Sequence, residues 1–153
     1  MRSFRPAAVL TLVATLMVPS GGAGVPETIP GPIAARLLGV IDGDTIIVRA
    51  RIWLGQDVET RLRLDGVDAP ELKGRCEHER RIAAAARDLI RSLGSGGRVV
   101  LRDIQYGKYA GRVVARVETP AGADFAEALL RAGLGRPYDG GRRPSWCDGA
   151  AAD

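Results

Sequence analysis

The sequence predicts a mainly β protein with helices: a small, partly open barrel of five strands with two to three helices packed on it. Three features favour this fold class, namely short runs of alternating apolar and polar residues, turn residues between the runs, and two segments with helical spacing. The expected strands are residues 36–41, 45–53, 60–64, 98–103 and 112–118. A chain of 153 residues is long enough for one such domain with a real core, and too short for two.

The first two strands are joined by the stretch Asp42-Gly43-Asp44-Thr45. An Asp-Gly pair between apolar runs is the strongest short signal for a β-hairpin, so a simple turn is the first interpretation. The alternative is that the two carboxylates hold something charged. This stretch taken by itself favours the turn.

The third strand presents a clear alternation, with Leu62 and Leu64 on one side and Arg63 on the other. We therefore expect Arg63 on a face outside the core. A helix is expected over residues 77–93, where apolar residues recur at helical spacing. A second is expected within residues 124–133, which begin with an aspartate cap and end with a glycine stop.

The first 23 residues have the pattern of a signal peptide. Arg2 and Arg5 precede an apolar run at residues 7–18, and small residues follow as far as Ala23. The apolar run is too short to span a bilayer comfortably, although an uncleaved anchor is the alternative. We expect cleavage after Ala23 and an exported protein, either periplasmic or secreted.

The mature chain is expected to have three parts. Residues 24–34 hold three prolines and are predicted to be a disordered lead-in, residues 35–138 form the domain, and residues 139–153 form a Gly- and Arg-rich tail. The chain has 22 lysine and arginine residues against 18 acidic ones. Without Arg2 and Arg5 the balance is 20 against 18, so net charge favours nucleic acid only weakly.

The chain has two cysteines, Cys76 and Cys147. In an exported protein an even number of cysteines favours a disulfide, which here would tie the tail to the domain. Such a bridge would stabilise the fold by up to about 4 kcal/mol. The alternative is a metal site that includes His78, the one histidine, but the spacing matches no common zinc pattern.

A second acidic segment, Arg63 to Glu71, reads RLDGVDAPE and supplies Asp68 and Glu71. Two strands of a tightly curled barrel could bring Asp44 and Asp68 together. Two carboxylates at one point repel each other unless a cation lies between them, and oxygen ligands in loops suit Ca²⁺. The alternative is that these are two unrelated turn aspartates.

Two arginines complete a possible site for a phosphodiester. Arg63 and Arg112 near a hard cation would neutralise the charge that builds up on phosphoryl oxygens in a transition state. Because no histidine is available as general base, a carboxylate must serve, and Glu71 is the candidate. Each of these side chains alone is typical of a solvated surface, and only the combination indicates chemistry.

Three segments together, IDGDT, RLDGVDAPE and YAGR, resemble the staphylococcal nuclease (thermonuclease) family in their order and spacing. The resemblance extends over residues 36–138. It implies an OB-fold barrel and Ca²⁺-dependent hydrolysis of DNA and RNA phosphodiester bonds, leaving 3′-phosphate ends. It also implies a monomer that acts on single-stranded or frayed regions of nucleic acid.

The functional residues that the resemblance implies form three groups. The metal site would comprise the carboxylates of Asp44 and Asp68, the backbone carbonyl of Ala69, Thr45 beside the ion and Asp42 behind it. The catalytic residues would be Arg63, Glu71 and Arg112. The residues that bind the nucleotide would be Lys108, Tyr109 and Tyr138.

The sequence also departs from the family pattern. Ala69 replaces a threonine, YAGR has one residue more than the commoner YGR before Arg112, and only Tyr138 is available to stack on a base. The usual C-terminal helix is not expected. Two rival functions remain: a binding module of the same fold without catalysis, and a calcium-stabilised structural protein, which would need neither Arg63 nor Glu71.

Overall fold

A computed structural model describes residues 27–108 and 112–148 of the chain. The predicted signal peptide and Tyr109 therefore lie outside the described residues. Within these ranges, no helix is both long enough and apolar enough to cross a membrane.

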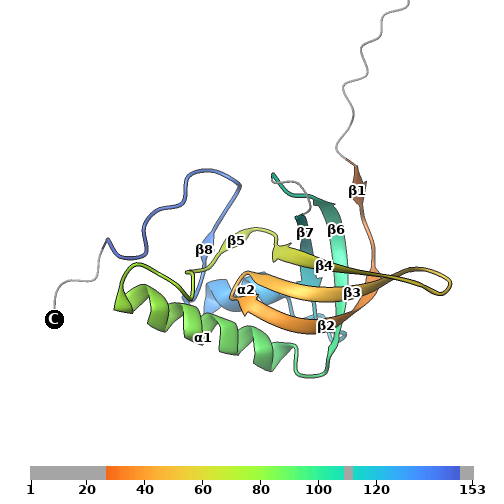
Figure 1. The fold of residues 1–153 in the computed structure, drawn as a ribbon, viewed down its shortest axis with the longest axis horizontal. Coiled ribbons are helices and arrows are strands. Elements are labelled where there is room, and N and C mark those ends of the chain that lie inside the picture. The colour runs from red at the N-terminus through yellow and green to blue at the C-terminus, as the bar shows by residue number, and fades with distance from the viewer. Residues whose placement is uncertain (1–26, 109–111, 149–153) are drawn as a thin grey trace, which may run out of the picture.

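Five strands close into a barrel (Figure 1). They are β2 (Ile33–Asp42), β3 (Thr45–Trp53), β4 (Gln56–Leu64), β6 (Arg98–Tyr106) and β7 (Val113–Glu118). Consecutive strands β2, β3 and β4 form antiparallel hairpins, β4 pairs with β7 in parallel, and β6 pairs with both β7 and β2. The predicted mainly β fold is confirmed, and the barrel is closed rather than partly open because β6 joins its two edges.

Two helices and three short strands complete the described fold. The helices are α1 (Glu77–Leu93) and α2 (Phe125–Arg131), and the strands are β1 (Thr28–Ile29), β5 (Val67–Asp68) and β8 (Arg136–Pro137). The structure differs from the predicted disordered lead-in over residues 27–34, because β1 pairs with β6 and β2 begins at Ile33. The prolines interrupt the ladder between β1 and β2 without preventing this edge pairing.

The core lies inside the barrel and beneath the two helices. Strand β3 shows the predicted alternation, since Ile46, Val48 and Ala50 are buried. The alternation ends at Ile52, which is 52% exposed where the β3–β4 hairpin extends away from the barrel in Figure 1. The largest fully buried side chains are Phe125, Ile46, Leu62, Leu64, Ile90, Leu129, Val48, Val67, Val99, Val117 and Pro70.

Helix α1 packs closely on the turn between β2 and β3. A Cβ atom placed on Gly43 in that turn would lie 2.7 Å from the Cβ of Ala86 and 2.9 Å from the Cβ of Ala69. Both distances are shorter than contacts between real Cβ atoms. Only glycine therefore lets the hairpin, the helix and the segment that contains Ala69 meet at one point.

We predict that Gly43→Ala lowers the free energy of unfolding by about 1–3 kcal/mol, because the added methyl group overpacks this contact. Urea denaturation measures the change. The matched control is Gly96→Ala, where a Cβ would meet no atom within 4 Å. The control should change stability by no more than about 0.5 kcal/mol. Equal effects of the two substitutions would show that the contact at Gly43 does not constrain the fold.

Candidate active site

The centre of the site is Arg63, which lies between two aspartates. Its Nη1 is 2.8 Å from Asp44 Oδ2, and its Nη2 donates to Asp68 Oδ1 at 3.1 Å. All three residues are buried, with exposures of 7% for Arg63, 3% for Asp44 and 4% for Asp68. One guanidinium thus pairs with two carboxylates that water barely reaches.

Strand register explains why these three side chains meet. Thr45, the first residue of β3, pairs with Arg63 on β4, so Asp44 at the hairpin turn lies beside Arg63. The backbone N–H of Leu64 donates to the Asp44 carbonyl at 2.8 Å. After β4 the chain turns at Gly66, where φ is +76°, and Asp68 comes back toward the strand it has just left. Arg63 Nη2 also donates to the Val67 carbonyl at 3.1 Å, which fixes this return.

Arg63 lies outside the apolar core, as expected, but its side chain is buried. Alternation correctly separates Arg63 from Leu62 and Leu64, but the segment that carries Asp68 covers its side of the strand. The burial has an energetic consequence, because removal of the arginine would take the counter-ion from the buried carboxylate of Asp44 and one of two cationic partners from Asp68.

The Asp42-Gly43-Asp44-Thr45 stretch is both a turn and part of a charged site. Strands β2 and β3 flank it as a hairpin, as the local pattern predicted. Asp44 Oδ2 also accepts a hydrogen bond from the Ala69 N–H at 3.0 Å, and its Oδ1 accepts one from Thr45 Oγ1 at 2.9 Å. The two interpretations of this stretch are therefore compatible, since the turn is what points Asp44 at Arg63.

Two further carboxylates, Asp42 and Glu71, lie beside this centre. Asp42 Oδ1 accepts a hydrogen bond from the Leu72 N–H at 3.3 Å, which holds the segment after Asp68 against the hairpin. Glu71 is more accessible, with 57% of its side chain exposed. Burial raises the pKa of Glu71 above its ordinary value, and the negative charges of Asp42 and Asp44 raise it further. These acids thus form one electrostatically coupled group.

The donor chemistry of this group fits Ca²⁺. Asp44 and Asp68 offer carboxylate oxygens at one guanidinium. Burial is the largest cause of the raised pKa of Glu71, and the repulsion from neighbouring acids that adds to it is what a nearby cation would relieve. Hard cations prefer all-oxygen ligands of this type. The residues present therefore suit the metal that the family resemblance implies.

A different cluster, Cys76, Glu79 and Cys147, has ligand atoms within 4.8 Å of one another. It does not offer a thiolate site, because the two cysteines form a disulfide. His78 lies outside the cluster, with its Nδ1 3.4 Å from Arg81 Nη2. The alternative of a metal site built from Cys76, His78 and Cys147 is therefore wrong for the disulfide-bonded form.

The predicted phosphate- and nucleotide-binding side chains line a hollow of about 550 Å³ beside Arg63. Lys108, Arg112 and Tyr138 contribute to its wall. In the parallel pairing of β4 and β7, Arg63 is opposite Val114, and alternation places Arg112 on the same face as Arg63. The guanidinium carbon of Arg63 is 5.2 Å from the centre of the Tyr138 ring. The extra residue in YAGR therefore does not move Arg112 away from the hollow.

The structure adds one residue to the site that sequence reasoning missed. Arg143, from the tail, places its Nε 3.1 Å from Asp68 Oδ1 and its Nη1 3.8 Å from Glu71 Oε1. The one available signal was the Arg142-Arg143 pair close to Cys147. That pair predicts a site residue only if the tail is known to fold back on the segment after Asp68.

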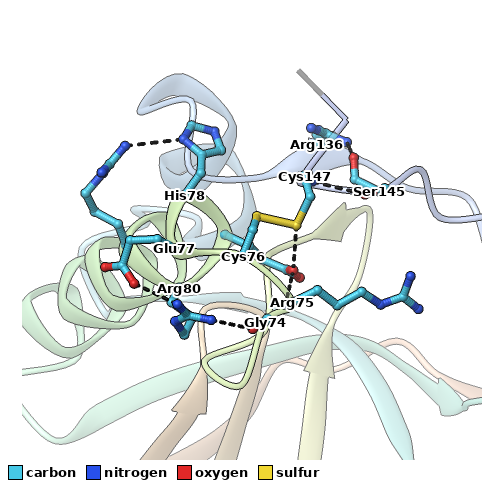
Figure 2. The surroundings of a disulfide bond; sticks show 11 residues. Gly74, Arg75, Cys76, Glu77, His78, Arg80, Arg136, Ser145 and Cys147 are labelled. Carbon is cyan, nitrogen blue, oxygen red and sulfur yellow. Dashed lines mark hydrogen bonds and ion pairs between the residues drawn. A yellow bond between two sulfur atoms is a disulfide. The ribbon is translucent and has the colours of Figure 1, made fainter. Parts of the chain in front are cut away.

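A disulfide between Cys76 and Cys147 holds the tail in this position (Figure 2). The Cα atoms are 6.0 Å apart, and 71 positions of sequence separate the two residues. Cys76 is the N-cap of α1, so the tail is anchored to the start of that helix. The predicted disulfide is confirmed. The described part of the tail, residues 139–148, contains no helix, as expected.

Comparison with known families agrees with this geometry. The profile described as staphylococcal nuclease homologue matches residues 61–146. The chain belongs to this family. The match covers Arg63, Asp68, Glu71 and Arg112, whereas Asp44 lies before it. Comparison with individual curated proteins gives no match.

We predict that Arg63→Ala destabilises the metal-free protein by about 3 kcal/mol, because Asp44 loses its buried counter-ion and Asp68 keeps only its pair with Arg143. Chemical denaturation with a chelator present measures the change. Arg49→Ala is the matched control, since Arg49 forms an exposed ion pair with Glu59 on the same sheet. The control should lose no more than about 1 kcal/mol. Similar losses of stability in both variants would mean that the buried ion pairs stabilise the fold no more than an exposed one does.

Proposed function

We propose that this protein is an exported, Ca²⁺-dependent nuclease that hydrolyses DNA and RNA phosphodiester bonds to 3′-phosphate ends. The observation that carries the proposal is the buried Arg63 between Asp44 and Asp68, with Arg112 in the same hollow as Arg63 and Glu71 in a hollow with Asp68. Membership of the staphylococcal nuclease homologue family supports the proposal.

In this proposal Asp44, Asp68 and the carbonyl of Ala69 hold the calcium ion, with Thr45 beside the ion and Asp42 behind it. When bound, Ca²⁺ supplies positive charge that favours attack on the phosphate. Thr45 already donates to Asp44, and Ala69 is held against it through its N–H. The replacement of threonine by alanine at position 69 is acceptable because the ligand is a backbone atom.

The reaction is a displacement at phosphorus by water. Glu71 accepts a proton from the attacking water, whose oxygen forms the new bond to phosphorus. The bond to the 5′ oxygen breaks, and that oxygen takes a proton from solvent. A raised pKa suits Glu71 to this role, because a general base works best when its pKa is closer to the operating pH.

The two arginines neutralise charge on the phosphoryl oxygens during this step. Arg112 lines the hollow and is exposed, so it is accessible to substrate. Arg63 is oriented by Asp44 and Asp68, which limits its movement before substrate arrives. A planar guanidinium can bind two phosphate oxygens at once, which a lysine cannot do.

Tyr138 and Lys108 are proposed to bind the nucleotide in the hollow next to Arg63. Tyr109, outside the described residues, is proposed to assist them. Stacking on Tyr138 requires an unpaired base, which favours single-stranded or frayed nucleic acid. The disulfide is consistent with export, because such bonds persist in oxidising compartments. A monomer suffices, since every residue invoked comes from one chain.

The main rival is a nucleic-acid-binding module that has lost catalysis. The five side chains Asp44, Arg63, Asp68, Glu71 and Arg112 favour catalysis, because binding alone does not need buried acids beside a candidate base. A calcium-stabilised structural protein is disfavoured by the basic hollow that adjoins the acids.

We predict that the purified mature chain cleaves single-stranded DNA and RNA with Ca²⁺ present and loses this activity when a chelator removes the ion. A gel-based or acid-soluble nucleotide assay measures cleavage, and end analysis identifies the 3′-phosphate. If the protein binds nucleic acid but cleaves none at every calcium concentration tested, the binding module would be favoured instead.

We predict that Arg112→Ala and Glu71→Gln each lower kcat by about 10²–10³-fold, because each removes an oriented group that acts in the transition state. Thermal melting should shift by only a few degrees, since both side chains are exposed. Arg91→Ala on α1, an exposed residue that does not line the hollow, is the control and should retain activity. Near-normal kcat in either site variant would remove that residue from the mechanism.

A further inference from the structure

The tail residue Arg143 lies close to Arg63, and the two arginines share the same contacts. Both guanidiniums approach the same oxygen, Asp68 Oδ1, at 3.1 Å. Both also lie 5.2 Å from the centre of the Tyr138 ring. A shared carboxylate oxygen and a shared ring hold two positive groups close together, although like charges repel each other. Such a pair balances Asp44 and Asp68, and it also has the geometry to bind a polyanionic ligand.

Arg143 is also the residue at which two hollows meet. It lines the hollow of about 550 Å³ that contains Arg63 and Arg112, and a second hollow of about 510 Å³ on the side of Asp68 and Glu71. Its side chain is 38% exposed, in contrast to 8% for that of Arg63. A nucleic-acid strand passing from one hollow to the other would therefore meet Arg143.

The segment that carries Arg143 is fixed at both ends. At its start, the Tyr138 N–H donates to the Gly66 carbonyl at 3.0 Å. At its end, Cys147 is bonded to Cys76, and Figure 2 shows Ser145 and Arg136 beside this bridge. Arg136 Nη1 donates to the Ser145 carbonyl at 3.1 Å. The disulfide therefore limits where Arg143 can move.

Charge balance explains only part of this placement. Arg63 is shared between Asp44 and Asp68, so Arg143 supplies the second positive charge beside these two acids, but it does so from a side chain that is 38% exposed. The other ion pair of Arg143, to the exposed Glu71, spans 3.8 Å and would contribute little to stability. Arg143 therefore adds an accessible positive charge where the two hollows adjoin.

We propose that Arg143 is a third phosphate-binding arginine, which contacts a phosphate of the bound strand, and that the Cys76–Cys147 disulfide holds it in place for this task. The inference rests on the proposed nuclease function and goes beyond it, because it makes substrate binding depend on the oxidised tail. Reduction of the disulfide would free the segment that carries Arg143 and weaken binding without removing Arg63, Glu71 or Arg112.

The test is steady-state cleavage of a single-stranded oligodeoxynucleotide with calcium. Arg143→Ala should raise KM by about tenfold, because a charge-assisted contact to substrate is lost, and should change kcat much less. Arg143→Lys should recover part of the loss, and added guanidinium ion should partly rescue Arg143→Ala. Arg91→Ala, which removes an exposed arginine on α1, should leave KM unchanged.

The disulfide is tested by a double substitution, Cys76→Ser with Cys147→Ser. Its KM should rise as in Arg143→Ala, and adding Arg143→Ala to it should produce little further change. Circular dichroism checks that the double variant is folded at the assay temperature. Arg143→Ala keeps the disulfide, so it tests the arginine even if the double variant unfolds.

Three results would overturn the inference. An active wild type with an unchanged KM in Arg143→Ala would remove Arg143 from substrate binding and leave the nuclease proposal standing. A lower kcat with an unchanged KM in Arg143→Ala would show that Arg143 has a role other than substrate binding. A wild type that cleaves no nucleic acid would defeat this inference together with the proposed function.

Discussion

The ion pairs of Arg63 with Asp44 and Asp68 are the interaction on which the rest of the site depends. Buried carboxylates are costly unless a counter-charge satisfies them, and one guanidinium here satisfies two. To make both contacts, the β2–β3 turn and the return after β4 must reach the same point. Gly43 allows that approach, and the hydrogen bond from Ala69 to Asp44 fixes it. The fold and the chemistry therefore share the same few residues.

The tail extends this arrangement in a way that the barrel alone does not provide. Residues 139–148 contain no helix, yet the disulfide to the N-cap of α1 gives them a fixed place. Arg143 then adds positive charge beside Glu71, whose neighbours Asp42 and Asp44 repel its ionised form. Acids and arginines are thus interleaved around the entrance to the site, and a covalent bond maintains part of that order.

Much of the fold could be predicted from the sequence, because its signals are local. Alternation in residues 45–53 identified β3, and helical spacing identified α1 with the bounds that the structure has. The burial of Arg63 could not be predicted, since alternation separates two faces of a strand but does not say what covers the second. Arg143 could not be placed either, because its position depends on a bridge between residues 71 positions apart and on the return of the chain after β8. Motif order predicted the other residues of the candidate site, whereas long-range packing decides how they are oriented.

Isothermal calorimetry of calcium binding tests most directly the central claim, that Asp44, Arg63 and Asp68 are the centre of a cation-dependent phosphodiesterase site. The account predicts one calcium ion per chain and an affinity at least about tenfold weaker in Asp44→Asn, because a charged ligand is lost. Asp88→Asn, which removes an exposed acid on α1, should leave the affinity unchanged. Absence of calcium binding by the wild type, or equal affinities in wild type and Asp44→Asn, would contradict the account.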